Sequence, residues 1–271
     1  MLKNILFFLM VGLSIPCFPW SANGHRVVGE IAYMHLDADA KETYAHINQS
    51  LNHQYRQYSL IGATVWLDVL YDAKHLAFKP MHYIDLPYKV DDTPAPKLSK
   101  VNAVSAINDA SRTLLDKTAS EEEQAIALRI LLHVVGDVHQ PLHTITRISQ
   151  AHPQGDRGGN DFHLGKNKIA PNLHRYWDRG GGLLSSPMST TEVKQLAENL
   201  ETQWSCPKEN LDAMHWAEES HLLAIQYAYA IQEDAAPTET YEANTRKICG
   251  QQLVYAGCRL AALLNSLKRR S

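Results

Sequence analysis

The chain has 271 residues, with 26 lysines and arginines against 29 aspartates and glutamates, and its formal charge is −3. This length fits one large domain with a substantial core, and the charge balance argues against duplex binding through a broad basic surface. An anionic substrate would have to be attracted by something local, such as bound cations.

The first nineteen residues have the features of a secretory signal. Lys3 gives them a positive start, and residues 5–15 are apolar but too few to span a bilayer as a helix. We expect residues 1–19 to be removed, although Pro19 is a poor residue before a cleavage point, and residues 20–271 to form the mature domain. No later stretch is long and apolar enough to cross a membrane, so we expect a secreted or periplasmic protein without membrane contact.

Export permits disulfides. Because Cys17 belongs to the presumed signal, Cys206, Cys249 and Cys258 predict one disulfide and one free thiol. The sequence leaves open which two cysteines pair.

Hydrophobic periodicity predicts helices along most of the chain and no strand of any length, so the expected fold is a single all-α domain with long loops around its site. In chain order, the expected helices cover residues 27–47 with an interruption near residue 36, 60–70, 99–117, a central helix after residue 120, 190–204, 211–231 and 238–268.

Local signals refine these boundaries. Ser99 is expected to cap one helix, and Ser120 followed by Glu123 forms a capping box for the central helix. Gly257 permits close approach of the last helix to a neighbour. Residues 144–182 contain seven glycines and two prolines with little periodicity, and so long a connection favours a functional role.

The stretch of residues 131–143 carries the strongest chemical signal. His133 and Asp137 are four residues apart, so a helix places both on one face, and Pro141 ends that helix before His143. Burying an imidazole and a carboxylate side by side is unfavourable unless something satisfies them, and a divalent metal ion would do so.

His174 and Asp178 repeat the same spacing after a Gly-Gly-Asn loop that ends at Asn160. Imidazole and carboxylate groups are suitable ligands for Zn²⁺. Asp68 and His82 are weaker candidates, because one could be a helix-end carboxylate held by backbone or lysine and the other a turn histidine.

His25 follows Trp20 by five residues, and cleavage before Trp20 would make its amino group and carbonyl possible ligands. The other histidines are predicted to be surface or hydrogen-bonded core residues; among them are His35, His46, His53, His75, His152, His215 and His221.

The full pattern resembles the secreted zinc-dependent single-strand nucleases and 3'-nucleotidases of fungi, plants and bacteria. The family signature runs from an N-terminal tryptophan through Gly-His, Trp-x-Asp, His-[Phe/Tyr]-Ile-Asp, His-x-x-x-Asp-x-x-Gln-Pro-Leu-His, Gly-Gly-Asn and Asn-Leu-His-x-x-Trp-Asp. Every piece occurs here in order, from Trp20 to Asp178.

The resemblance implies a trinuclear zinc cleft in an all-α fold of the zinc phospholipase C type. One zinc would be held by Asp68, His82, His133 and Asp137, a second by His143, His174 and Asp178, and a third by Trp20, His25 and Asp137. Asp137 would bridge two ions because a carboxylate has two oxygens to share.

It also implies hydrolysis of single-stranded DNA and RNA to 5'-phosphorylated products, with 3'-nucleotidase activity, through attack on phosphorus by a hydroxide held between zincs. Asp85 would orient the attacking water, Tyr83 would stack on a base, and Asn160 would bind substrate.

Two positions depart from the family pattern or lie outside its ligand set. Tyr71 stands where the family often has an arginine near the phosphate, and Lys74 or Lys89 could supply that cation instead. His139 lies inside the central motif but outside the ligand set, so we expect it to support the ligands or to be exposed.

Two other functions remain open. A zinc phospholipase C shares the fold and the tryptophan, but its last ligand is typically a glutamate, whereas this chain has Asp178. A non-catalytic zinc protein would usually have closed sites without Tyr83 and Asp85 beside them. For the nuclease we expect no protein partner and a monomer, with single strands and 3'-nucleotides as the bound molecules.

Overall fold

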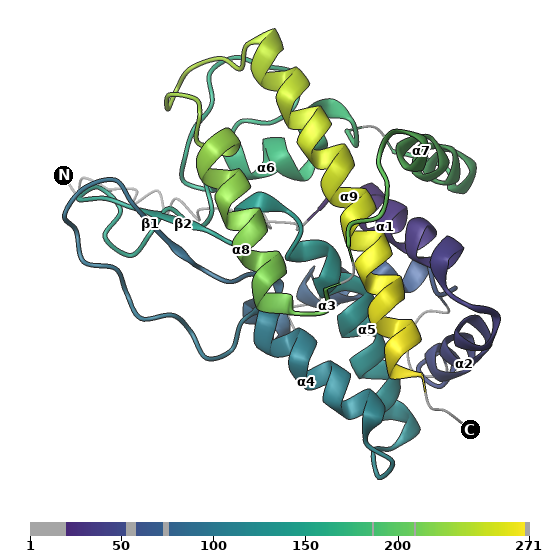
Figure 1. The fold of residues 1–271 in the computed structure, drawn as a ribbon. Helices are drawn as coiled ribbons and strands as arrows, with labels where there is room; N and C mark the ends of the chain where they lie inside the picture. The colour runs from purple at the N-terminus through teal and green to yellow at the C-terminus, as the bar shows by residue number, and fades with distance from the viewer. Residues whose placement is uncertain (1–19, 53–57, 73–75, 186, 209, 269–271) are drawn as a thin grey trace, which may run out of the picture.

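The computed structural model describes residues 20–52, 58–72, 76–185, 187–208 and 210–268 (Figure 1). The predictions made for the signal segment, Lys74, His53 and His75 lie outside the described residues.

The described chain is mostly helical, as expected, and none of its helices is long and apolar enough to cross a membrane. The α-helices are α1 (Ala22–His35), α2 (Ala38–Gln49), α3 (Trp66–Asp72), α4 (Ala103–Leu115), α5 (Glu121–Asp137), α6 (Leu173–Asp178), α7 (Thr190–Gln203), α8 (Ala213–Leu223) and α9 (Glu239–Leu267). Short 3₁₀-helices are η1 (Gly62–Val65), η2 (Leu76–His82), η3 (Pro141–His143) and η4 (Gly180–Gly182), and a π-turn, η5 (Ala224–Ala228), extends α8.

Helix α5 occupies the centre of the fold. Every residue of 127–137 is buried, and a helix that is covered on all sides belongs inside a bundle. Helices α1, α2, α4 and α9 pack around it, and Figure 1 shows α5 between α4 and α9. The C-terminal turn of α5 is therefore held deep inside the protein.

The start of α5 is confirmed and the start of α4 is corrected. Ser120 Oγ accepts from the Glu123 N–H at 3.2 Å, and the Glu123 carboxylate accepts from the Ser120 N–H at 2.8 Å, which completes the expected capping box. Helix α4 is capped by Asn102, whose Oδ1 accepts from the Ser105 N–H at 3.0 Å, and not by Ser99. Ser99 lies too early and contributes only its carbonyl, which accepts from Asn102.

Two short strands contradict the expectation of no strand. β1 (Pro87–Lys89) pairs in parallel with β2 (Thr146–Ile148), and just before β1 the Ile84 N–H donates to the His143 carbonyl at 2.8 Å. Three-residue strands are too short to show a period of two in the sequence. Their pairing brings the loop after η2 beside the loop after η3, and the expected connection of residues 144–182 contains both β2 and α6.

The close approach of α9 to α1 was also predicted correctly. A Cβ atom at Gly257 would lie 2.5 Å from the Cβ of Ile31, so only glycine allows this packing without displacement. One disulfide joins Cys206 to Cys258, and Cys249 is a buried free thiol, so the expected one pair and one thiol are both present.

Candidate metal centre

Eight of the nine predicted metal ligands come from six helical elements and the ninth precedes the first of them, and all nine are at least nine-tenths buried. They are Trp20 before α1, His25 in α1, Asp68 in α3, His82 at the end of η2, His133 and Asp137 in α5, His143 in η3, and His174 and Asp178 in α6.

Asp137 is the centre of the first group of side chains. Its Oδ2 lies 3.3 Å from His133 Nε2 and 3.2 Å from His82 Nδ1, whereas its Oδ1 lies 3.4 Å from His25 Nε2. Asp68 Oδ1 completes the group at 3.6 Å from His133 Nε2. The two oxygens of one carboxylate thus face two different sets of donors.

A second group lies beside the first. His143 Nε2 and His174 Nε2 are 3.2 Å apart, and the Asp178 oxygens lie 3.8 Å and 3.7 Å from them, respectively. His143 Nδ1 is 3.8 Å from Asp137 Oδ1, so the two groups adjoin at Asp137.

Backbone carbonyls fix the orientation of three of these imidazoles. His133 Nδ1 lies 2.6 Å from the Thr64 carbonyl and His174 Nδ1 lies 2.7 Å from the Gly158 carbonyl, so each Nδ1–H donates to its carbonyl and each neutral ring keeps a lone pair on Nε2. His143 Nδ1 donates to the His82 carbonyl at 2.7 Å in the same way. Two Nε2 atoms that face each other at 3.2 Å must share a proton or a metal cation, and histidine ligands to metals are oriented by such carbonyls.

Several buried polar atoms of the centre have no hydrogen-bond partner among the described residues. Among them are His25 Nδ1, Asp68 Oδ1, Asp137 Oδ1 and Asp178 Oδ2. Leaving such atoms unsatisfied is costly, and a divalent cation would satisfy them. The donors are imidazole nitrogens and carboxylate oxygens, so they fit Zn²⁺.

The pKa shifts of the buried side chains also indicate a site for cations. Burial alone would lower the pKa of His133, but Asp137 and Asp68 raise that pKa to about 9. Burial alone would raise the pKa of Asp137, yet His133 and other imidazoles hold it well below its ordinary value. The carboxylates therefore favour positive charge at His133. Burial and neighbouring imidazoles instead lower the pKa of His25 to about 3 and that of His82 to about 4, so these two rings are neutral and can offer a lone pair to a cation.

Trp20 is held against the ends of α5 and α6. Its indole Nε1–H donates to the Gly136 carbonyl at 2.8 Å, and the next residue, Ser21, donates its N–H to the Asp178 carbonyl at 3.0 Å. The main chain of Trp20 is thereby fixed near the ends of α5 and α6. Its role as an amino-terminal ligand stays a prediction, because that role depends on where the chain is cleaved.

The predicted substrate residues lie on the loops around the centre. Tyr83 is half-buried directly after His82, and its carbonyl accepts from the Ala103 N–H at 2.9 Å. Asp85 is exposed to water, yet partial desolvation and the charge of Asp156 raise the pKa of its carboxyl group, while His143 and His174 lower that pKa.

Asn160 has a structural role in its loop. Its side-chain amide donates to the Arg157 carbonyl at 2.8 Å, which closes the turn of the Gly-Gly-Asn motif. Gly158 adopts a φ of +61°, and a Cβ there would lie 2.2 Å from the Leu142 carbonyl oxygen, so this turn requires glycine. Substrate binding by Asn160 stays a prediction.

His139 is fully buried, so the expectation that it could be exposed is not met. Its Nδ1–H donates to the Val135 carbonyl at 2.7 Å, and its Nε2 accepts from Arg259 at 3.0 Å, which leaves no ring lone pair for a metal. Of the two candidate phosphate-binding lysines, Lys89 is exposed on β1. Tyr71 belongs to α3.

Three residues that the sequence analysis did not single out also contribute to the centre. Gln140 donates to Asp178, and the carbonyls of Thr64 and Gly158 receive the histidine protons. The sequence signal for Gln140 is its place inside the central motif, between the buried helix and His143. Backbone acceptors leave no signal in a sequence.

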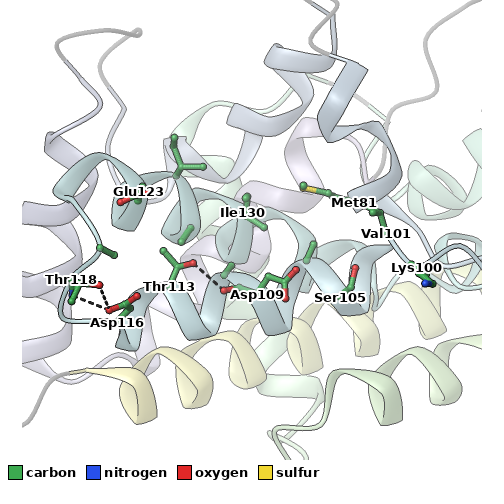
Figure 2. Close-up of a pocket in the computed structure, with 15 residues that line it drawn as sticks. Met81, Lys100, Val101, Ser105, Asp109, Thr113, Asp116, Thr118, Glu123 and Ile130 are labelled. Atoms are coloured by element: carbon green, nitrogen blue, oxygen red, sulfur yellow. Dashed lines mark hydrogen bonds between the residues drawn. The ribbon is translucent and has the colours of Figure 1, made fainter.

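A groove of about 560 Å³ lies between α4 and α5 and not at this centre (Figure 2). The close-up shows Asp116 bound to Thr118 and Thr113 bound to Asp109, and Glu123 belongs to the cap of α5. None of the nine candidate ligands lines this groove, so we assign it no part in the chemistry.

The helical fold and the buried, adjoining groups of imidazoles and carboxylates are typical of a protein with a multinuclear metal centre. The family model described as S1/P1 Nuclease matches residues 20–269, and the chain belongs to this family, as the motif resemblance predicted.

Individual relatives agree with the family match. Endonuclease 2 of Arabidopsis thaliana is 28% identical over 92% of this chain and 90% of its own length. Endonuclease 1 of the same plant is 26% identical over 95% of this chain and 91% of its own length. Nuclease P1 of Penicillium citrinum is 28% identical over 68% of this chain and 67% of its own length.

Proposed function

We propose that the protein is a secreted or periplasmic zinc-dependent endonuclease that hydrolyses single-stranded DNA and RNA to 5'-phosphorylated products and also removes 3'-phosphates from nucleotides. The observation that carries this proposal is the junction at Asp137, where a single carboxylate faces donors on both sides at 3.3 Å and 3.4 Å. Membership of a nuclease family supports the reaction type.

Three zinc ions are the proposed cofactors, and the residues that would hold them are those grouped above, with Asp137 shared between two ions. Zinc at these positions would supply Lewis-acid stabilisation of the negative charge that develops on a phosphoryl group. Binding of the third ion requires a free amino group at Trp20. The proposed removal of residues 1–19 would provide it.

The residues of the protein would position the substrate and a water molecule. Asp85 lies where the charges of His143 and His174 reach its carboxylate, and this carboxylate would accept a hydrogen bond from the attacking water. Tyr83 would stack on a base next to the scissile bond. Since only an unstacked base can reach a half-buried ring, this contact would favour single strands over duplexes.

The proposed function is tested with the exported protein itself. N-terminal sequencing and metal analysis should give Trp20 as the first residue and three zinc ions per chain. Single-stranded DNA and RNA should be cut to 5'-phosphorylated products faster than a duplex of the same sequence. Phosphocholine release from phosphatidylcholine vesicles without nucleotide release would favour a phospholipase, and retained zinc without turnover of any of these substrates would favour a non-catalytic role.

Tyr83→Ala is expected to raise KM for single-stranded DNA by about tenfold, because stacking on one base contributes about 1–3 kcal/mol. The value of kcat should change little, since the ring does not touch the reacting atoms. Steady-state kinetics on a short oligonucleotide measures both constants. Tyr83→Phe retains the ring and should behave as the wild type; an equal loss in both variants would point to the hydroxyl group instead.

Asp85→Asn is expected to lower kcat/KM by about a hundredfold, because a positioned carboxylate contributes about 10²–10⁴-fold to proton transfer. The raised pKa of this carboxyl group also sets the sign of a pH effect. Activity should be full where the carboxylate is ionised and should fall as pH decreases through the raised pKa, well above the ordinary aspartate range.

This decrease in activity at acidic pH, the acidic limb of the pH profile, should be absent in Asp85→Asn. It is measured as kcat/KM between about pH 4.5 and about pH 8 with zinc in excess. Asp92→Asn changes an exposed carboxylate in the nearby loop and is the matched control. An unchanged acidic limb in Asp85→Asn would assign that limb to the metal ligands.

A further inference from the structure

Gln140 lies at the turn between α5 and η3, and its side chain is fully buried. The side-chain oxygen Oε1 accepts from the Leu142 N–H at 2.6 Å, and the side-chain Nε2 donates to Asp178 Oδ1 at 2.6 Å. One amide side chain thus joins the chain after α5 to the last residue of α6. Neither the family motif nor the metal-ligand set assigns it a role.

The direction of these hydrogen bonds is set by chemistry. A backbone N–H can only donate, so the oxygen of the amide must face Leu142. The NH₂ group must then face Asp178, whose carboxylate accepts. The orientation of Gln140 therefore does not depend on choosing between two similar amide positions.

Gln140 donates to only one of the two oxygens of Asp178. Oδ1 receives the amide proton and also lies 3.8 Å from His143 Nε2, whereas Oδ2 lies 3.7 Å from His174 Nε2 and has no hydrogen-bond partner among the described residues. An apolar residue at position 140 would leave Oδ1 without this donor inside the protein. A glutamate there would place a second negative group against Asp178.

We propose that Gln140 is a positioning residue that holds the Asp178 carboxylate so that Oδ2 faces the second group of donors, and that it thereby sets the zinc affinity of the position formed by His143, His174 and Asp178. This inference rests on the proposed zinc centre. It adds a residue whose side chain would touch neither metal nor substrate. It also explains why a glutamine can be buried in this turn, since both ends of its amide are used.

The test compares zinc binding by the full mature chain and by two variants. Gln140→Met removes both amide contacts at similar size, and Gln140→Glu keeps an acceptor for Leu142 but removes the donor to Asp178. Gln252→Met is the matched control, because Gln252 is a buried glutamine on α9, which supplies none of the candidate ligands. Zinc is titrated against a competing chelator, and bound zinc is counted by elemental analysis.

Both Gln140 variants should bind one of three ions about 10–100-fold more weakly, which is the usual effect of removing a partner of a metal ligand. The other two affinities and those of Gln252→Met should match the wild type. The weakened ion should be the one that His174→Ala loses. A double variant that carries both His174→Ala and Gln140→Met should therefore lose no further ion. Saturating zinc should restore kcat in Gln140→Met.

The outcomes separate this inference from the proposed function. Fewer than three ions in the wild type would contradict the trinuclear centre itself. Three ions in the wild type with unchanged affinities in either Gln140 variant that folds would overturn the positioning role and leave the function standing. Equal weakening of all three ions would also overturn it, because that result indicates general destabilisation.

Discussion

Asp137→Asn is expected to lower kcat/KM on single-stranded DNA by about a thousandfold, which corresponds to about 4 kcal/mol. The carboxylate has His133 Nε2 at 3.3 Å on one side and His25 Nε2 at 3.4 Å on the other. An amide keeps the shape but loses the charge, and its NH₂ would direct a donor at one of these imidazoles. Removing one partner from buried charges typically costs about 3–5 kcal/mol, so stability should fall together with activity.

Zinc content, thermal unfolding and kinetics of this variant should be measured on the same preparation. We expect two zinc positions to weaken together, because the residue is proposed to serve both. Glu30→Gln is the control, since Glu30 is a buried carboxylate on α1 whose charged neighbours are Lys194, Arg26 and Glu198 and none of the candidate ligands. Retained nuclease activity with three bound zinc ions in Asp137→Asn would contradict the shared carboxylate.

Most of the candidate site could be predicted because its signals are local. His133 and Asp137 keep one helical turn between them, and His174 and Asp178 do the same, so a helix brings each pair together whatever surrounds it. The apolar run before His133 also predicted correctly that this helix is buried. These features depend on neighbours in the sequence.

The arrangement of the pairs could not be predicted from the same signals. Parallel pairing of β1 with β2 brings the loop carrying Asp85 beside His143, and three-residue strands leave no readable period. The acceptors for His133 and His174 are backbone carbonyls of residues far away in the sequence. Similarly, Asn102 and not Ser99 caps α4, because the choice between nearby caps depends on where the preceding loop turns.

Burial of His139 illustrates the same limit. Its position two residues after Asp137 left open whether it would be exposed, and the deciding contact is Arg259 on α9. Burial and the Arg259 charge together lower the pKa of His139 to about 3, so the ring stays neutral and accepts from the guanidinium. Only the packing of α9 against α5 reveals this contact.

Removal of zinc by a chelator is expected to lower the melting temperature by more than about 10 °C. A ligand at a hundred times its Kd stabilises the folded state by about 2.7 kcal/mol, and three such ions together contribute several kcal/mol. For a chain of this size, each kcal/mol shifts the melting temperature by about 2–4 °C. The effect should be large because the donors come from α1, α3, α5 and α6 and from the turns η2 and η3, and a cation satisfies buried atoms on all of them.

Scanning calorimetry with and without chelator measures the shift, and added Zn²⁺ should reverse it whereas added Mg²⁺ should not, because imidazole nitrogens suit zinc better than magnesium. His174→Ala is the informative comparison. It should show a smaller chelator effect than the wild type, since it already lacks a donor of the second group. A chelator effect below about 2 °C in the wild type would mean that the buried lone pairs are satisfied without metal, and the centre would then have to be assigned another role.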